Sequence, residues 1–285
     1  MRYDAVIPLL GSGPLVYVDC GARGSALPSW LRPAKTARYI GIEADAAECE
    51  RLTARQKPRH EYIAAALGRS AEARTLYVTK NPACSSLLRP NSELLAPFGE
   101  MSDFFIVERE VAVSTIPLDM CLARHSITSV DFLELDTQGA ELEVLEGAER
   151  VLDASVLGLL IEVEFAPMYH DQPLFGDVDR FMRSRGFELF DLMRYRVRRG
   201  PLASTIPTRG QLLWGRAFYL RAPSRCQSPA MLRRLAGLAA LAGIPDLTLD
   251  ILSRVGSDVS SDVRKAVCRA QQELDQSGSI RVWRD

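Results

Sequence analysis

Short apolar runs that end in an acid, a glycine or a turn alternate with amphipathic segments along most of the chain. A short apolar run bounded by turn residues is typical of a buried strand, whereas apolar residues three or four positions apart predict a helix. We predict strands at 16–19, 38–43, 61–68, 76–79, 105–113, 130–136, 156–165, 187–192 and 217–221. Helices are predicted at 45–56, 142–152 and 175–185. This alternation is typical of an α/β fold.

The pattern changes after Pro223. From there the sequence predicts no strand but three helices, each bounded by Pro, Ser or Gly, at 229–243, 247–255 and 261–276. We therefore predict two units, a main domain at 1–225 and a C-terminal helical appendage at 226–285. The appendage would cover either the main domain or a partner.

The composition is that of an ordinary globular protein, with 285 residues of which 47% are hydrophobic and 25% charged. Thirty-five basic and 36 acidic residues give a net charge of −1, so we expect no nucleic-acid partner. The six cysteines lack zinc-type spacing and suit a reducing compartment, which predicts a cytoplasmic protein. Neither a signal peptide nor a transmembrane segment is apparent.

The segment 16–24 is the first candidate for chemistry, because a buried strand ends there in Asp19 and enters a turn formed by Gly21, Ala22 and Gly24. In open α/β sheets, ligands bind beyond the carboxyl ends of the strands, where glycine lets the backbone approach closely. A carboxylate at this place would repel the pyrophosphate of a dinucleotide but would hold the α-ammonium of S-adenosylmethionine (SAM). Asp19 therefore favours SAM over NAD.

A second strand also ends in an acid, Glu43, at about the 20-residue interval that places a carboxylate on ribose hydroxyls in nucleotide sites. We assign Glu43 and the adjacent Ala44 to the cofactor site; a solvated strand end is the alternative for Glu43. The small residues Ala65 and Ala66 would leave room for a flat adenine ring, or would simply pack within their strand.

Candidates for catalysis follow two later strands. Asp136 ends one of them, and Glu162 and Glu164 share a face at the carboxyl end of the next. His170, one of only three histidines, lies in the loop that follows. For the two glutamates the alternative is an exposed pair neutralised by Arg or Lys.

Two loops carry polar residues that could contact a ligand. Ser85 and Ser86 lie in the long loop 81–99, and loops of that length are usually functional or mobile. The turn-rich segment 193–210 would recognise an anionic acceptor or form a solvated face, and its arginines are Arg194, Arg196, Arg198, Arg199 and Arg209.

Several segments resemble the FkbM family of SAM-dependent methyltransferases, most specifically 130–141 with 145–148. The others are 16–24, 39–45, 115–119, 162–164, 186–189 and 209–214. The resemblance implies a class I methyltransferase fold, a mostly parallel, Rossmann-like seven-stranded sheet with helices on both faces. It also implies O-methylation of sugars, polyketides and related metabolites. The family often has lysine where this sequence has Glu134, so the role of that lysine does not carry over.

Methyl transfer from a sulfonium is an in-line displacement, which requires an aligned acceptor and, for a weakly acidic hydroxyl, a base. Asp136, Glu164 and His170 are the nominees for the base. Alternatively, Asp136 and a second carboxylate would hold a divalent cation such as Mg²⁺ that lowers the pKa of the hydroxyl.

We therefore expect a SAM-dependent O-methyltransferase that acts on a hydroxyl of a sugar, a glycan or a sugar-containing metabolite, with a homo-oligomer left open. One alternative is an NAD-dependent sugar oxidoreductase, for which a G-x-G-x-x-G motif would be expected and only Gly21 and Gly24 are present. The other is a catalytically silent SAM-fold module that binds a partner through 228–285.

Overall fold

The computed structural model describes residues 7–11, 13–24, 37–200 and 206–255. Of the predicted helix at 261–276, only residues 263, 265, 267 and 268 are described, and the rest of that prediction lies outside the described residues.

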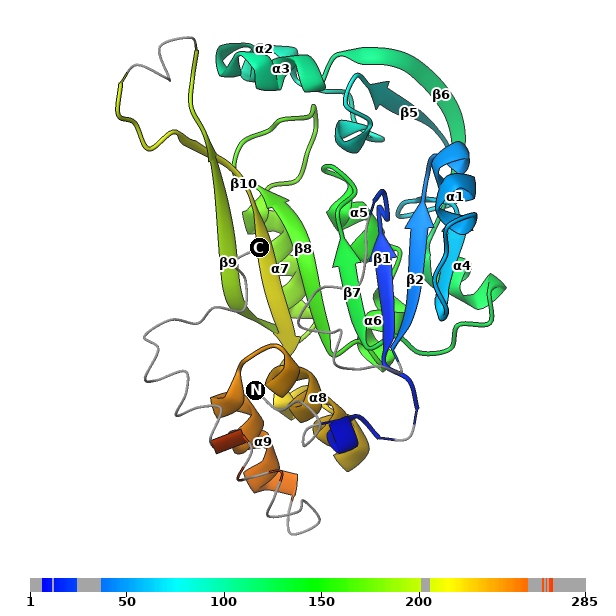
Figure 1. Cartoon of the computed structure of the whole chain (residues 1–285), viewed down its shortest axis with the longest axis vertical. Helices are drawn as coiled ribbons and strands as arrows, with labels where there is room; N and C mark the ends of the chain where they lie inside the picture. Colours follow the sequence, from blue (N-terminus) through cyan, green and yellow to red (C-terminus); the bar gives the residue numbers. More distant parts are fainter. Residues whose placement is uncertain are drawn as a thin grey trace.

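A seven-stranded sheet runs through the molecule in the order β3-β2-β1-β7-β8-β10-β9 (Figure 1). The pairs β1–β2, β2–β3, β1–β7 and β7–β8 are parallel, whereas β10 is antiparallel to both β8 and β9. This topology confirms the expected class I, Rossmann-like sheet. The strands are β1 (Val16–Cys20), β2 (Arg38–Glu43), β3 (His60–Ala64), β7 (Phe132–Leu135), β8 (Gly158–Glu164), β9 (Phe187–Val197) and β10 (Gln211–Arg221).

A second, three-stranded sheet lies above the carboxyl ends of these strands in Figure 1, in the order β4-β6-β5. The strand predicted at 61–68 is divided between the two sheets, because β2 ends at Glu43 and the chain then changes partner from β2 to β6. Ala65 marks the change, and its N–H donates to the Glu43 carbonyl at 3.0 Å. The strands of this sheet are β4 (Ala66–Leu67), β5 (Ala73–Thr79) and β6 (Val107–Ile116).

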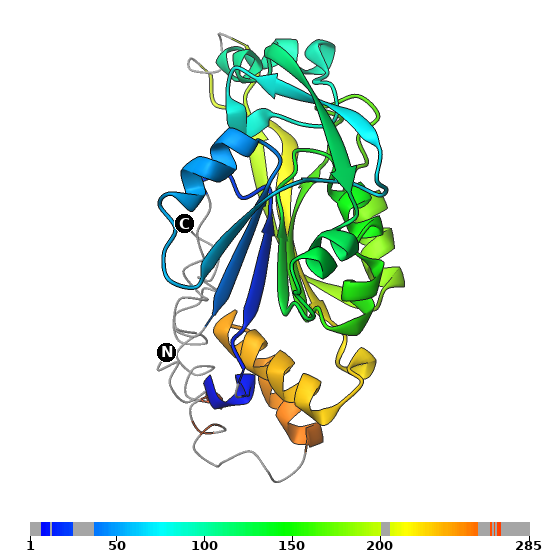
Figure 2. The same cartoon turned by 90° about the vertical axis from the view of Figure 1, so that its right-hand side faces the viewer.

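Helices cover both faces of the large sheet (Figure 2). On one side lie α4 (Leu118–Arg124), α5 (Glu141–Glu146), α6 (Glu149–Ala154) and α7 (Phe175–Ser184), and on the other lies α1 (Ala46–Thr53), whereas α8 (Pro229–Leu241) and α9 (Pro245–Val255) lie below the amino ends of the strands. The short helices η2 (Ile7–Leu10), η4 (Pro82–Cys84), α2 (Ser92–Leu95), η5 (Ala96–Phe98), α3 (Glu100–Phe104) and η7 (Pro223–Arg225) lie in the connections.

The helix predicted at 142–152 is two helices, α5 and α6, separated at Gly147. The carboxylate of Asp119 accepts the N–H groups of Arg150 at 2.8 Å and Val151 at 2.9 Å, so a side chain from α4 caps a new helix start. The sequence pattern could not reveal this cap, because Asp119 lies far from α6 along the chain.

The two faces of the sheet have different cores. Val18 and Leu133 pack with α4 to α7, whereas Tyr17, Phe132 and Phe218 lie on the opposite face together with α8 and α9. Tyr17 stacks on Phe132 with ring centroids 5.5 Å apart, and Phe132 on Phe218 at 5.9 Å. The described helices of the C-terminal region therefore share a core with the main sheet.

Candidate active site

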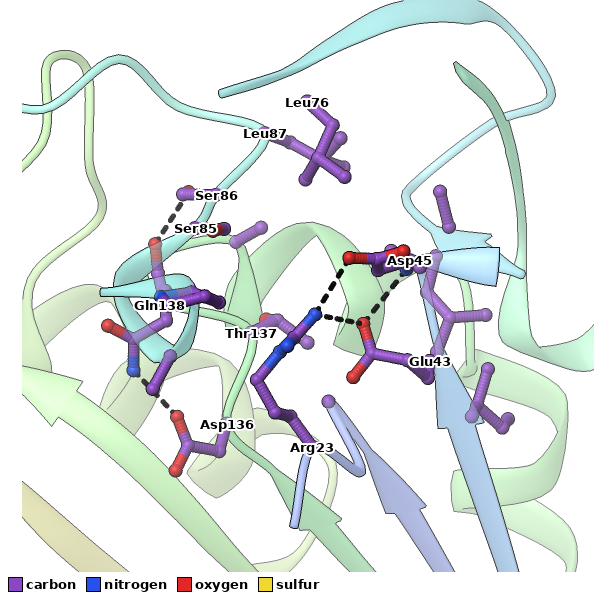
Figure 3. Close-up of a pocket in the computed structure, with 18 of the residues that line it drawn as sticks. Arg23, Glu43, Asp45, Leu76, Ser85, Ser86, Leu87, Asp136, Thr137 and Gln138 are labelled. Carbon is purple, nitrogen blue, oxygen red and sulfur yellow. Dashed lines mark hydrogen bonds and ion pairs between the residues drawn. The ribbon is translucent and has the colours of Figure 1, made fainter. Parts of the chain in front are cut away.

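A pocket lies beyond the carboxyl ends of β1, β2 and β7, where the sequence places the cofactor site (Figure 3). Gly21 follows β1 with a φ of 93°, and a Cβ there would collide with the carbonyl oxygen of Asp136. This close approach requires glycine and joins the first turn to the end of β7. Six of the predicted site residues line the pocket: Gly21, Glu43, Ala44, Ala65, Ala66 and Asp136.

Glu43 ends β2 and turns its carboxylate into this pocket. Its Oε1 accepts the N–H of Asp45 at 2.9 Å and lies 3.9 Å from the guanidinium of Arg23, which also contacts Asp45 at 3.0 Å (Figure 3). Burial raises the pKa of Glu43, while the Asp45 hydrogen bond and the Arg23 charge oppose the shift. The remaining oxygen of Glu43 is thus placed to accept a further hydrogen bond.

Small and apolar side chains form the walls of the pocket. Ala65 and Ala66 line it from the crossing between β3 and β4, and Leu76, Val78 and Leu87 line it from β5 and the loop after it. An adenine ring needs such a narrow apolar slot, so the lining fits the predicted place of adenine.

Ser85 and Ser86 also line this pocket, and both take part in structural hydrogen bonds. The hydroxyl of Ser85 accepts the N–H of Thr79 at 3.2 Å, and that of Ser86 donates to the carbonyl of Gln138 at 2.7 Å. The loop that carries them is therefore tied to the turn after β7.

Asp19, Ala22 and Gly24 lie outside the pocket lining. Asp19 is 1% exposed on the same face of the sheet as Tyr17, and the hydroxyl of Tyr39 donates to its Oδ2 at 2.6 Å. Ala22 is fully buried and its N–H donates to the carbonyl of Ile42. The ammonium-binding role of Asp19 stays a prediction.

Four carboxylates gather at the ends of β7 and β8. The side-chain amide of Gln138 donates to Asp136 at 2.7 Å and to Glu162 at 2.5 Å, which joins the two strand ends. Glu141 accepts the N–H groups of Thr137 at 2.7 Å and Gly139 at 2.9 Å. One oxygen each of Glu141, Glu162 and Glu164 lies within 4.8 Å of the others.

Burial is the largest cause of the raised pKa values of the three glutamates in this group. It raises the pKa of Glu141 to about 7 and those of Glu162 and Glu164 well above the usual glutamate value, and the charge of Asp136 contributes to each shift. Glu164 is 2% exposed, and its Oε1 has no hydrogen-bond partner among the described residues. The alternative was an exposed pair neutralised by Arg or Lys, but Glu164 is buried, Glu162 is partly buried, and neither forms an ion pair among the described residues.

His170 is exposed and lies outside the pocket lining. Its backbone N–H donates to the carbonyl of Arg89 at 2.8 Å, and its neighbour Tyr169 forms a β-bridge with Pro90. The structure thus fixes the backbone of this turn but does not place the imidazole among the four carboxylates.

Glu134, the residue that departs from the family pattern, forms an ion pair with an arginine. Arg216 of β10 and the hydroxyl of Tyr17 both donate to its carboxylate. Burial, followed by the charge of Asp136, raises the pKa of Glu134 to about 8, and the bound guanidinium favours the charged form.

Sequence reasoning missed several residues of the site. Arg23 could have been noticed, because it lies between the two glycines of the first turn. Gln138 follows Asp136 in the family-like segment but was given no role. Tyr195 gave no signal in the sequence. It stacks on Trp214 at 5.4 Å, and burial and the charge of Glu162 raise its pKa, which depends on the pairing of β9 with β10 and of β10 with β8.

The helices in the described part of the chain include none that is long and apolar enough to cross a lipid bilayer.

The family model of the methyltransferase FkbM domain matches residues 19–189. A search of curated proteins gave no match.

Similar solved structures include magnesium protoporphyrin IX methyltransferase from Synechocystis PCC 6803, with 11% identity, a TM-score of 0.38, and 77% of this chain and 78% of the other covered. A TehB-like SAM-dependent methyltransferase from Corynebacterium glutamicum has 10% identity, a TM-score of 0.35 and coverage of 78% and 89%. Precorrin-6y C5,15-methyltransferase from Geobacter metallireducens has 10% identity, a TM-score of 0.35 and coverage of 77% and 86%.

Proposed function

Because the chain belongs to the FkbM methyltransferase family, we propose that it transfers a methyl group from SAM to a hydroxyl of a sugar, a glycan or a sugar-containing metabolite. The family establishes a SAM-dependent methyltransferase. The hydroxyl acceptor and its sugar character are the proposed part.

The contacts of Glu43 support the assignment of the nucleoside site. Its carboxylate lies at the end of β2 with one oxygen held by Asp45 and Arg23, so the group is oriented before any ligand binds. A carboxylate accepts both hydroxyls of a ribose through charge-assisted hydrogen bonds. Ala65 and Ala66 would then face the adenine, and Asp19 would hold the ammonium beneath the Gly21 turn.

The observation that carries O-methylation is the carboxylate pair Asp136 and Glu162, joined by Gln138 at the edge of the cofactor pocket. A carboxylate beside the cofactor can orient a hydroxyl and take its proton.

In the proposed reaction, the acceptor oxygen attacks the methyl carbon of SAM. The bond between carbon and sulfur breaks, its electron pair stays on sulfur, and S-adenosylhomocysteine leaves. The hydroxyl proton passes to the Asp136 carboxylate, with Glu164 and His170 as the other nominees.

A direct test incubates the protein with SAM that carries a deuterated methyl group and with separate sets of acceptors: sugars, nucleotide sugars, polyols, amino sugars and thiols. We expect labelled methyl ethers, detected by mass spectrometry, together with S-adenosylhomocysteine. Labelling of amines or thiols alone would contradict O-methylation. Calorimetric titration with NAD tests the oxidoreductase alternative, and SAM binding without turnover on any acceptor would favour the silent module.

We also propose a cytoplasmic location and a small-molecule or glycan partner. All six cysteines are free, including the exposed Cys268, which suits a reducing compartment. Fractionation of the native host, with the protein detected by antibody, tests the location.

A further inference from the structure

Three glutamates from two elements converge beside the proposed acceptor site. Glu141 begins α5, whereas Glu162 and Glu164 end β8, and one carboxylate oxygen from each lies within 4.8 Å of the other two. Glu141 and Glu164 are each 2% exposed. The three carboxylates therefore face one another with little solvent between them.

One carboxylate oxygen of this group, Oε1 of Glu164, differs from the others in its hydrogen bonding. Glu141 is fixed by Thr137 and Gly139, and Glu162 accepts the amide of Gln138. In contrast, Oε1 of the buried Glu164 accepts no hydrogen bond in the described part of the molecule, although burial raises the pKa of Glu164 and the nearby side-chain amide of Gln172 lowers it in part. A buried carboxylate oxygen without a partner is costly, so a ligand with positive charge would satisfy it.

The basic side chains of the described residues do not neutralise the group. Within the described ranges, no arginine or lysine forms an ion pair with Glu141, Glu162 or Glu164. Arg216 is the direct cross-strand neighbour of Glu162, but its guanidinium binds Glu134 instead. Desolvated like charges at this distance repel strongly unless a cation lies between them.

We propose that Glu141, Glu162 and Glu164 together bind one divalent cation. Only oxygen ligands are present, which suits a hard cation rather than Zn²⁺. Every pair of these oxygens lies within 4.8 Å, which is close enough for the three to bind one ion. Ca²⁺ and Mg²⁺ both take carboxylate oxygens as ligands.

The position of the site gives the ion a role in the reaction. Gln138 links Glu162 to Asp136, which lines the cofactor pocket, so a bound cation would lie next to the acceptor hydroxyl and lower its pKa. This role rests on the proposed function. The binding of the ion does not, because it depends only on the three carboxylates.

The test measures Mn²⁺ binding to chelator-treated full-length protein by electron paramagnetic resonance, with Ca²⁺ and Mg²⁺ binding measured by calorimetry. We expect one Mn²⁺ per chain, with Ca²⁺ or Mg²⁺ competing for the same site. Glu162→Gln and Glu164→Gln, which keep the side-chain shape, should each weaken Mn²⁺ binding at least about 10-fold. The matched control Glu188→Gln changes an exposed glutamate of β9 and should leave binding unchanged.

SAM binding, measured on every variant, shows that the fold is retained. Absence of Mn²⁺ and Ca²⁺ binding to the wild-type protein would overturn the proposal, and so would equal binding in Glu164→Gln and Glu188→Gln. Failure of the proposed function looks different: the protein would bind one Mn²⁺ but methylate no hydroxyl, with or without chelator.

Discussion

Arg216 of β10 binds the carboxylate of Glu134 on β7 by reaching past Glu162, its direct neighbour on β8. Glu134 stands where the family resemblance leads one to expect a lysine, and this acid is paired with a cation from two strands away. The arrangement neutralises Glu134 and leaves Glu162 without a basic partner among the described residues.

We predict that this pair is strongly coupled. Arg216→Met leaves a buried carboxylate without its cation, which costs roughly 3–5 kcal/mol in a fully buried pair. Because the Arg216 side chain is 28% exposed, we expect about 2–3 kcal/mol in the free energy of unfolding by urea. Adding Glu134→Gln should recover at least about 1 kcal/mol of that loss, since the uncompensated charge is then removed. Strictly additive effects of the two substitutions would show that the pair contributes nothing.

A second prediction concerns the C-terminal helices. Arg234 of α8 donates to both oxygens of Asp131, just before β7, and to the carbonyls of Leu10 and Pro14. Arg234→Ala breaks all these bonds at once and should lower the free energy of unfolding by about 2–4 kcal/mol. The adjacent Arg233→Ala is the matched control and should change it by less than about 0.5 kcal/mol. If Arg234→Ala lowers the free energy of unfolding no more than Arg233→Ala does, the hydrogen bonds of Arg234 do not contribute and α8 is held by apolar packing alone.

SAM binding should depend on Glu43 and on pH. Glu43→Ala should weaken SAM by about 10- to 150-fold, the loss of about 1.5–3 kcal/mol from charged hydrogen bonds to two ribose hydroxyls. Burial raises the pKa of Glu43, so its charge is lost as pH falls through a value above the usual 4.5, and affinity falls in the same direction. Calorimetry should therefore show wild-type affinity declining from neutral to mildly acid pH and a flatter profile for Glu43→Gln. A Glu43→Ala protein that binds SAM like wild type would remove the ribose assignment.

The role of Asp19 is tested by comparing two ligands. Asp19→Asn should weaken SAM more than methylthioadenosine, which lacks the amino-acid moiety and its ammonium. Tyr39→Phe removes the 2.6 Å hydrogen bond to Asp19 and should produce a smaller change in the same direction. If both ligands lose affinity equally, Asp19 acts on the turn rather than on the ammonium.

The sequence predicted correctly those strands and helix starts that depend on residues close together in the chain. Buried strands with an acid at the end predicted β1, β2 and β7, and Asp45 predicted the start of α1, where its side chain accepts the N–H groups of Ala47 and Glu48. The family-like segment 130–141 predicted the turn after β7. These features depend on residues close together in the chain.

Features that depend on distant residues were not predictable. Asp119 starts α6 and divides a helix whose apolar spacing is continuous. Arg216 binds Glu134 rather than its cross-strand neighbour, which only the positions of three strands decide. The partnership of Gln138 with Asp136 and Glu162 likewise appears only when β7 and β8 are paired.

The last prediction concerns the proton of the acceptor hydroxyl. Asp136 lies at the end of β7, lines the cofactor pocket and is bonded to Gln138, so it is the residue best placed to take the proton or to orient the hydroxyl. Asp136→Ala should lower the rate of methyl transfer by roughly 10²–10⁴-fold with SAM affinity nearly unchanged, because general-base catalysis typically contributes that much. His170→Ala is the comparison, since its side chain is exposed and outside the pocket lining. A loss of the same size in His170→Ala, with Asp136→Ala fully active, would transfer the role of the base to the histidine. Full activity in both variants would leave alignment of the acceptor as the source of catalysis.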